Sequence, residues 1–177
     1  RFAMQSQDLR KNLMEKTRQK ISTEYGAREY HIIKAVNLIE DLDQLPFPDR
    51  EIYYNKYPYL KNWSVKRFIS GRGCHLNCSF CHNHMLKSIF KNKGNYIRKR
   101  SPENLIEEIL LVKNKYRMKT ISFSDDVFTL NKKWLEKFLD LYKKEVNVPF
   151  ICNTTPDTIN EKEIILLKNA GCYGLMT

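Results

Sequence analysis

The stretch Phe68-Ile69-Ser70-Gly71-Arg72-Gly73-Cys74-His75-Leu76-Asn77-Cys78-Ser79-Phe80-Cys81 runs from a short apolar strand into three cysteines spaced C-x3-C-x2-C. Cysteine thiolates are the usual ligands of iron–sulfur clusters, and a cubane cluster normally takes four of them. A loop that offers three leaves one iron without a protein ligand, and an open coordination position is what a catalytic metal centre keeps. The spacing therefore predicts a reactive 4Fe–4S cluster held by Cys74, Cys78 and Cys81.

Zinc is the main alternative at this loop, with His82 or His84 as a fourth ligand beside the three cysteines. Zinc sites usually pair two short cysteine knuckles, and the sequence has no second C-x2-C. Disulfide bonds are not favoured, because the five cysteines are an odd number and no secretory signal opens the chain. The free thiols indicate a reducing compartment, so the cytoplasm is the expected location.

Working outward from the loop, regular structure is predicted from Val65 onward. Strands are expected at 68–69, 119–124, 148–153 and 173–176. The helices between them have recognisable ends. Ser101 caps the first, with Pro102 at its first position; Asn131 caps the second; a capping box at 160–163 opens the third, and Gly171 ends it.

Alternating strands and helices predict an α/β fold of parallel strands with right-handed crossover helices. A closed barrel needs more chain than this. The segment 65–177 therefore reads as the front half of a partial (β/α) TIM-type barrel, truncated at its C-terminus. The cysteine loop and the pair Asp125-Asp126 both follow strand carboxyl ends, where α/β folds place their chemistry.

Two segments precede this predicted core. Residues 1–27 read as a polar helix, centred on 4–21, that forms a linker or the tail of a preceding domain. Residues 28–64 read as a linker and strap rich in proline and tyrosine, with a short strand at 30–33. The prolines at Pro46 and Pro48 impose extended backbone there. The aromatic residues of 47–63 are expected to pack across the outside of the core rather than to stack on nucleic acid.

The chain of 177 residues carries a formal net charge of +11. Six basic residues and no acidic ones lie between His84 and Arg100, a pattern that suits either phosphate binding or a solvated surface. Because lysine is frequent throughout the chain, the solvated surface is the favoured interpretation and a nucleic-acid partner is not. No apolar run approaches the ~18 residues of a membrane span.

Several motifs, taken together and in order, resemble those of the radical SAM superfamily and in particular its cobalamin-binding members. The similarity covers roughly residues 30–177. It rests on C-x3-C-x2-C with Phe80 before the last cysteine and on the segments 42–50, 70–74, 98–103, 121–128, 153–157 and 170–172.

The resemblance implies an enzyme in which Cys74, Cys78 and Cys81 hold the cluster. The open iron would chelate the amino and carboxylate groups of S-adenosylmethionine, and one electron would cleave this cofactor to methionine and a 5′-deoxyadenosyl radical. By the same resemblance Phe80 lies near the adenine, and Asp125 and Asp126 contact the methionyl ammonium. The alternative for the two aspartates is capping of the helix that starts after Asn131.

The family pattern is incomplete in this chain. Thr155 stands where relatives often carry arginine, which puts that contact in doubt. Only about 27 residues precede the matching region, so cobalamin is expected only through a domain absent from this chain. Cys152 and Cys172 are expected to be apolar packing residues rather than ligands.

The resemblance implies methyl transfer or formation of a carbon–carbon or carbon–sulfur bond, with flavodoxin or ferredoxin as the reductant. A tRNA methylthiotransferase-like enzyme and a zinc-stabilised RNA-binding module are the alternatives. The substrate itself cannot be read from these residues.

Overall fold

The computed structural model describes residues 18–23, 26–31 and 35–177. A four-stranded parallel sheet lies at its centre, with the strands in chain order β3-β6-β7-β8. This succession is that of the first strands of a (β/α) barrel, and within the described residues it does not close. The predicted fold class is confirmed. The strands are β3 (Val65–Phe68), β6 (Thr120–Phe123), β7 (Phe150–Asn153) and β8 (Cys172–Met176).

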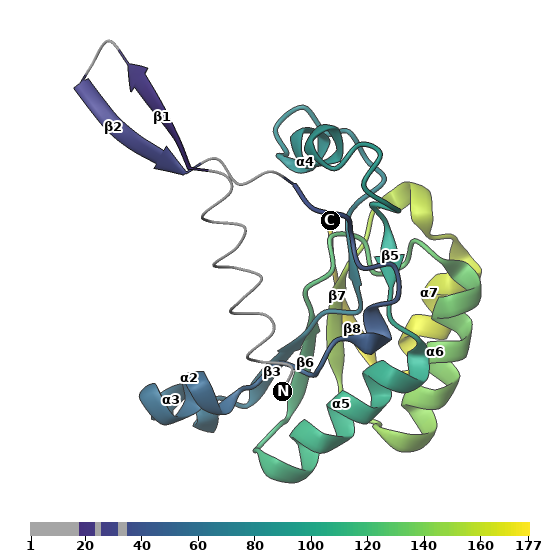
Figure 1. Cartoon of the computed structure of the whole chain (residues 1–177). Helices are drawn as coiled ribbons and strands as arrows, with labels where there is room; N and C mark the ends of the chain where they lie inside the picture. The colour runs from purple at the N-terminus through teal and green to yellow at the C-terminus, as the bar shows by residue number, and fades with distance from the viewer. Residues whose placement is uncertain (1–17, 24–25, 32–34) are drawn as a thin grey trace.

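Three crossover helices cover one face of this sheet (Figure 1). All three begin at the predicted caps. Ser101 Oγ accepts from Asn104 N at 3.1 Å, Asn131 Oδ1 accepts from Trp134 N at 3.0 Å, and Asn160 forms the predicted capping box with Glu163. No helix among the described residues combines the length and apolar character of a bilayer span. The helices are α5 (Pro102–Lys115), α6 (Lys132–Glu145) and α7 (Glu161–Asn169).

An aromatic cluster joins the sheet to these helices. Phe123 on β6 is fully buried, and its ring centroid lies 4.5 Å from that of Phe128 and 5.4 Å from that of Phe150 on β7. Phe138 of α6 meets Phe123 edge-on at 5.5 Å and stacks on Trp134 at 5.0 Å. Each such ring buried contributes roughly 1.5–3 kcal/mol, so this face of the sheet holds most of the fold's stability.

The crossover from β3 to β6 contains elements that the sequence did not reveal. These are α4 (Asn83–Ile89) and a short antiparallel pair, β4 (Gly71–Arg72) with β5 (Arg98–Lys99). A Cβ on Gly71 would lie 2.8 Å from Arg98 O, so only glycine permits this close approach. The pair ties the start of the cysteine loop to the segment that follows α4.

The predicted linker packs on the core through both polar and aromatic side chains. Asp43, in the 3-10 turn η1 (Leu42–Gln44), accepts from Ser101 N at 2.9 Å, and Glu40 accepts from Asn95 N at 2.8 Å. Beyond it lie two short helices, α2 (Glu51–Lys56) and α3 (Pro58–Asn62). Of their tyrosines only Tyr54 is buried, against Tyr116, while Tyr59 is 68% exposed.

The N-terminal helix prediction is wrong where the structure describes it. Residues 18–21 belong to β1 (Arg18–Thr23), which pairs antiparallel with β2 (Gly26–His31). β1 ends on Ile21-Ser22-Thr23, and β-branched residues favour strands. The strand expected at 30–33 overlaps β2 at Tyr30 and His31. Ile32, Ile33 and residues 1–17 lie outside the described residues.

Candidate functional site

The cysteine loop leaves the carboxyl end of β3 and leads into α4. Cys74 is buried, whereas Cys78 and Cys81 are partly exposed, and all three are free thiols. A turn closes on Cys81 N, which donates to Cys78 O at 3.0 Å. Among the described residues, no three histidine, cysteine, aspartate or glutamate side chains converge closely enough to hold a metal ion. The structure thus places the three predicted ligands on one loop without bringing their sulfurs into ligand geometry.

Lys87 of α4 holds this loop in shape. Its ammonium donates to His75 O at 2.7 Å, Leu76 O at 2.8 Å and Asn77 Oδ1 at 2.9 Å. An ammonium has three donors, and all three are used on residues between Cys74 and Cys78. Sequence reasoning missed this role, because Lys87 is one member of a basic run.

The other basic residues of that run are also largely engaged inside the protein. Arg98 donates to Ile39 O at 2.7 Å, Lys99 to Phe128 O at 2.6 Å, and Arg100 Nε to Asn104 Oδ1 at 2.6 Å. The favoured interpretation of the run as a solvated surface is therefore wrong for these side chains and for Lys87.

Asp125 holds the start of the cysteine loop at Ser70, which is called the root of the loop below. It is 5% exposed, and its carboxylate accepts from Ser70 N at 2.9 Å and from Ser70 Oγ at 2.5 Å. Hydrogen bonds to an ionised carboxylate are about twice as strong as neutral ones. Asp125 thus joins the end of β6 to the end of β3, a role that sequence reasoning missed.

Asp126, the next residue, is exposed, and its Oδ2 accepts from Asn83 Nδ2 at 3.2 Å. The same Nδ2 lies 3.5 Å from Cys81 Sγ. Asp126 is therefore the aspartate of the pair that stays accessible beside the cysteine loop. Neither aspartate caps α6, because Asn131 does so.

A second buried carboxylate, that of Glu108, stabilises the root of the loop through Arg100. Glu108 of α5 receives Arg50 from the linker at 2.9 Å and also Arg100. Arg100 in turn donates its backbone N–H to Ser70 O at 2.8 Å. A charge buried in this way needs its partners, so removing either arginine would leave Glu108 with one cationic partner instead of two.

A cavity of about 240 Å³ lies beside the loop root. Groups of both charges line it, and Arg98 Nε is buried without a hydrogen-bond partner among the described residues. S-adenosylmethionine carries a carboxylate and an ammonium on its methionyl end, and this lining supplies a counterpart for each. The charged lining residues are Arg72, Arg98, Lys99, Asp125 and Asp126.

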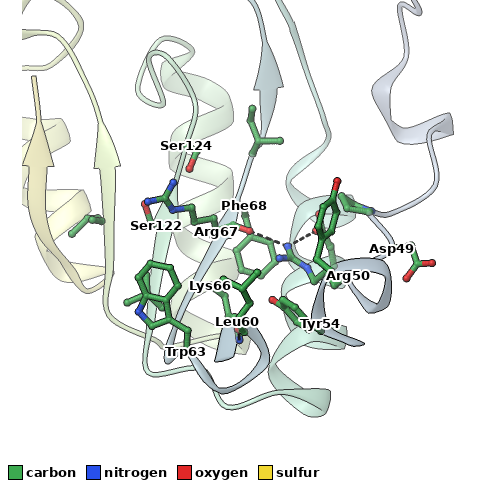
Figure 2. A pocket seen from close by; sticks show the side chains of 16 residues that line it. Asp49, Arg50, Tyr54, Leu60, Trp63, Lys66, Arg67, Phe68, Ser122 and Ser124 are labelled. Carbon is green, nitrogen blue, oxygen red and sulfur yellow. Dashed lines mark hydrogen bonds and ion pairs between the residues drawn. The ribbon is translucent and has the colours of Figure 1, made fainter. Parts of the chain in front are cut away.

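A larger cavity of about 490 Å³ follows the face of the sheet that the helices leave uncovered. Figure 2 shows Trp63, Arg67, Ser122 and Ser124 around it, with Arg50 bonded to Arg67 O and Glu108 at its rim. Ile69 and Ser124 line both cavities. The two spaces therefore adjoin at the carboxyl ends of β3 and β6.

The remaining predicted residues divide into exposed and packed ones. Phe80 is 92% exposed at the tip of the loop, and His82 and His84 are exposed as well. Cys152 is fully buried in the core, where a hydrogen bond with Cys172 and burial raise the pKa of its thiol. Thr155 contacts Thr158 Oγ1 at 3.4 Å.

Comparisons with known proteins identify relatives of this chain. Residues 68–176 match the model of the radical SAM superfamily. The chain is 30% identical over 138 residues to an uncharacterized methyltransferase of Pyrococcus horikoshii, covering 77% of this chain and 28% of the relative. It is 24% identical over 151 residues to the cytidylyl-2-hydroxyethylphosphonate methyltransferase of Streptomyces wedmorensis, covering 78% and 27%.

One solved structure shares the fold. It is the radical S-adenosylmethionine methyltransferase TsrM of Kitasatospora setae, with tryptophan substrate and an aza analogue of the cofactor bound. The TM-score is 0.52 at 16% identity, over 88% of this chain and 31% of that one. The chain spans less than a third of each of these three proteins. Since the family model covers more than half of the sequence, the chain belongs to the radical SAM superfamily of enzymes.

Proposed function

We propose that this chain is the core of a radical SAM methyltransferase, which binds a 4Fe–4S cluster and S-adenosylmethionine at the carboxyl edge of the sheet. One observation carries the proposal. Three thiols share one loop, held by Lys87, directly beside a cavity whose lining offers both charges. The names of the relatives support methyl transfer over other radical reactions.

The donor set of the loop fits an iron–sulfur cluster. Cys74, Cys78 and Cys81 supply three sulfurs, and no fourth cysteine lies on the loop. Cluster binding requires thiolates, whereas burial raises the pKa of the free Cys74 thiol. Metal coordination would reverse that preference, since a coordinating thiol is deprotonated.

The methionyl end of S-adenosylmethionine would lie in the cavity of about 240 Å³. Asp126 is exposed and would accept the ammonium, since a carboxylate facing an ammonium forms a charge-assisted pair. Asp125 would act indirectly. Its hydrogen bond with Ser70 would set the direction in which the cysteine loop leaves the sheet. Phe80 would offer its exposed ring to the adenine.

When bound, the cluster supplies the electron that cleaves S-adenosylmethionine reductively. The chain's own residues bind and orient: Asp126 holds the ammonium, while Lys87 keeps the loop in one conformation. The adjoining cavity of about 490 Å³ would receive the acceptor of the methyl group. A flavodoxin or ferredoxin as reductant, a cobalamin bound by a further domain, and a cytoplasmic location remain predictions.

Anaerobic reconstitution with iron and sulfide, followed by metal analysis, tests the proposal. We expect about four irons and four sulfides per chain, lost in Cys74→Ala, Cys78→Ala and Cys81→Ala. Cys152→Ala and Cys172→Ala serve as matched controls and should keep the cluster, because Cys152 lies in the core and Cys172 is its neighbour. Stoichiometric zinc without sulfide would instead support the zinc module and overturn the proposal.

A further inference from the structure

Asn83, the first residue of α4, makes contacts that neither the fold nor the proposed cofactor site requires. It is 7% exposed and lies two positions after Cys81. Its Nδ2 is 3.5 Å from Cys81 Sγ and 3.2 Å from Asp126 Oδ2, and its Oδ1 accepts from Tyr96 OH at 2.7 Å. One buried amide therefore meets a predicted cluster ligand, a predicted cofactor ligand and a phenol.

The chemistry of the partners fixes which way this amide points. A carboxylate and a thiolate only accept hydrogen bonds, and an amide NH2 has two donors to give. The reverse orientation would turn Asn83 Oδ1 toward Asp126 and Cys81 and set acceptor against acceptor. The two N–H groups are thus used on the Asp126 carboxylate and the Cys81 sulfur, and the oxygen is used on the Tyr96 hydroxyl.

Tyr96 stabilises that orientation of the Asn83 amide. Its hydroxyl donates to Asn83 Oδ1, and its ring stacks on Phe90 with the centroids 6.5 Å apart. Its backbone carbonyl lies close to Gly73 of the cysteine loop, since a Cβ on Gly73 would lie 2.3 Å from Tyr96 O. Gly73 also has φ +83°, a conformation that glycine adopts readily. Tyr96 is therefore packed against the loop and not free to turn away.

Hydrogen bonds to cysteine sulfurs are among the factors that set the reduction potential of an iron–sulfur cluster. A donor stabilises the more negative, reduced state more than the oxidised one, because the reduced state places more charge on the sulfurs. A donor to Cys81 therefore raises the potential. Removing it lowers the potential and makes the cluster harder to reduce.

We propose that Asn83 is a positioning residue that tunes the reduction potential of the cluster through Cys81 and links that ligand to Asp126. The inference rests on the proposed function, since it needs the cluster. Asn83 acts through Cys81 and Asp126. Tyr96 acts in turn through Asn83, by holding the amide in the donating orientation.

The test is a titration of the reconstituted protein with dithionite, followed by electron paramagnetic resonance without S-adenosylmethionine, so that the readout is independent of catalysis. Dithionite donates one electron to each cluster. In Asn83→Leu we expect the ratio of reduced to oxidised cluster at a given potential to fall about tenfold, which is a shift of about 59 mV to lower potential for one electron. Iron and sulfide contents are measured in parallel.

Two further variants sharpen the result. Tyr96→Phe keeps the amide but removes its anchor, so its shift should have the same sign and be smaller. Asn114→Leu is the matched control: it makes the same substitution at an exposed site on α5 and should leave the potential unchanged.

An unchanged potential in cluster-loaded Asn83→Leu would overturn the inference. If Asn83→Leu assembles no cluster, Asn83→Ser decides in its place, because the shorter side chain does not reach both Cys81 and Asp126. A lowered potential in that variant supports the inference, and an unchanged one contradicts it. Failure of the unmodified protein to form any iron–sulfur cluster would instead contradict the proposed function itself.

Discussion

The two faces of the central sheet differ in kind although the same strands build both. On the helix-covered face Phe123 and Phe150 are fully buried in an aromatic cluster. On the other face Ser122, Ser124 and Arg67 line the larger cavity (Figure 2). Because side chains alternate along a strand, one residue sets stability while its neighbour faces the cavity. Stability on β6 therefore depends mainly on the side chain that points toward the helices, Phe123, whereas its neighbours Ser122 and Ser124 line the larger cavity.

The largest expected effect comes from removing an aromatic side chain from the helix-covered face of the sheet. Phe123→Ala removes a fully buried ring that contacts Phe128, Phe138 and Phe150, so we expect a loss of about 3–5 kcal/mol in the free energy of unfolding. Urea unfolding measures it. The matched control is Ser124→Ala, directly after β6 and exposed, which should stay within about 0.5 kcal/mol of the unmodified protein. Similar losses in both variants would contradict the division between the faces.

A smaller loss of stability is expected from Asp125→Asn. The amide oxygen can still accept from Ser70 N and the amide NH2 can donate to Ser70 Oγ, but the negative charge is lost, and hydrogen bonds to a charged group are worth about 1.5–3 kcal/mol. Urea unfolding should show a loss in that range, and amide hydrogen exchange at Ser70 should speed up. Asp126→Asn is the control, because its carboxylate is exposed and should alter unfolding little.

The converse holds for cofactor binding. Asp126→Asn should weaken the binding of S-adenosylmethionine roughly tenfold to a hundredfold, since it removes the charge that would face the ammonium. Iron content should stay the same. Equilibrium binding of the cofactor to the reconstituted protein gives the measurement. Unchanged affinity would leave Asp126 as a partner of Asn83 and nothing more.

The smallest expected effect concerns Lys99, which lies between the aromatic cluster and the smaller cavity. It lines the smaller cavity, yet its ammonium lies 4.2 Å from the centroid of the Trp134 ring and 4.9 Å from that of Phe128. Burial lowers its pKa from 10.5 to about 8. Between these two values the unfolded chain binds more protons than the folded one, so stability contributed by this group rises with pH.

Lys99→Met removes that contribution. We therefore expect the free energy of unfolding of the unmodified protein to rise relative to that of Lys99→Met between pH 8 and pH 10.5. Below pH 8 the difference between the two should be constant. Taking the difference cancels the cysteines and tyrosines that titrate in the same range. Parallel profiles throughout would show that the folded lysine titrates normally.

Sequence patterns predicted the elements that depend on neighbours in the chain. The caps at Ser101, Asn131 and Asn160 are recognisable because a cap bonds to a residue two or three positions away. The cysteine spacing likewise marked the loop, since all three residues lie within it.

Contacts between distant segments escaped prediction. Ser70 and Asp125 are 55 positions apart, and no periodicity connects them. α4 has no capping side chain, and its two informative residues, Asn83 and Lys87, contact the loop rather than the apolar core. The β1–β2 hairpin was not predicted, although two of the last three residues of β1, Ile21 and Thr23, are β-branched.

The chain separation between paired strands also orders their assembly. Asp125 accepts from Asn153 across only 28 positions but from Ser70 across 55. Closing the longer loop costs more chain entropy, so we expect β6, α6 and β7 to associate early and β3 to dock after them. The cysteines lie inside that late-closing segment. Iron and sulfide would thus meet thiols that are still accessible, before Asp125 fastens the root of the loop and Cys74 becomes buried.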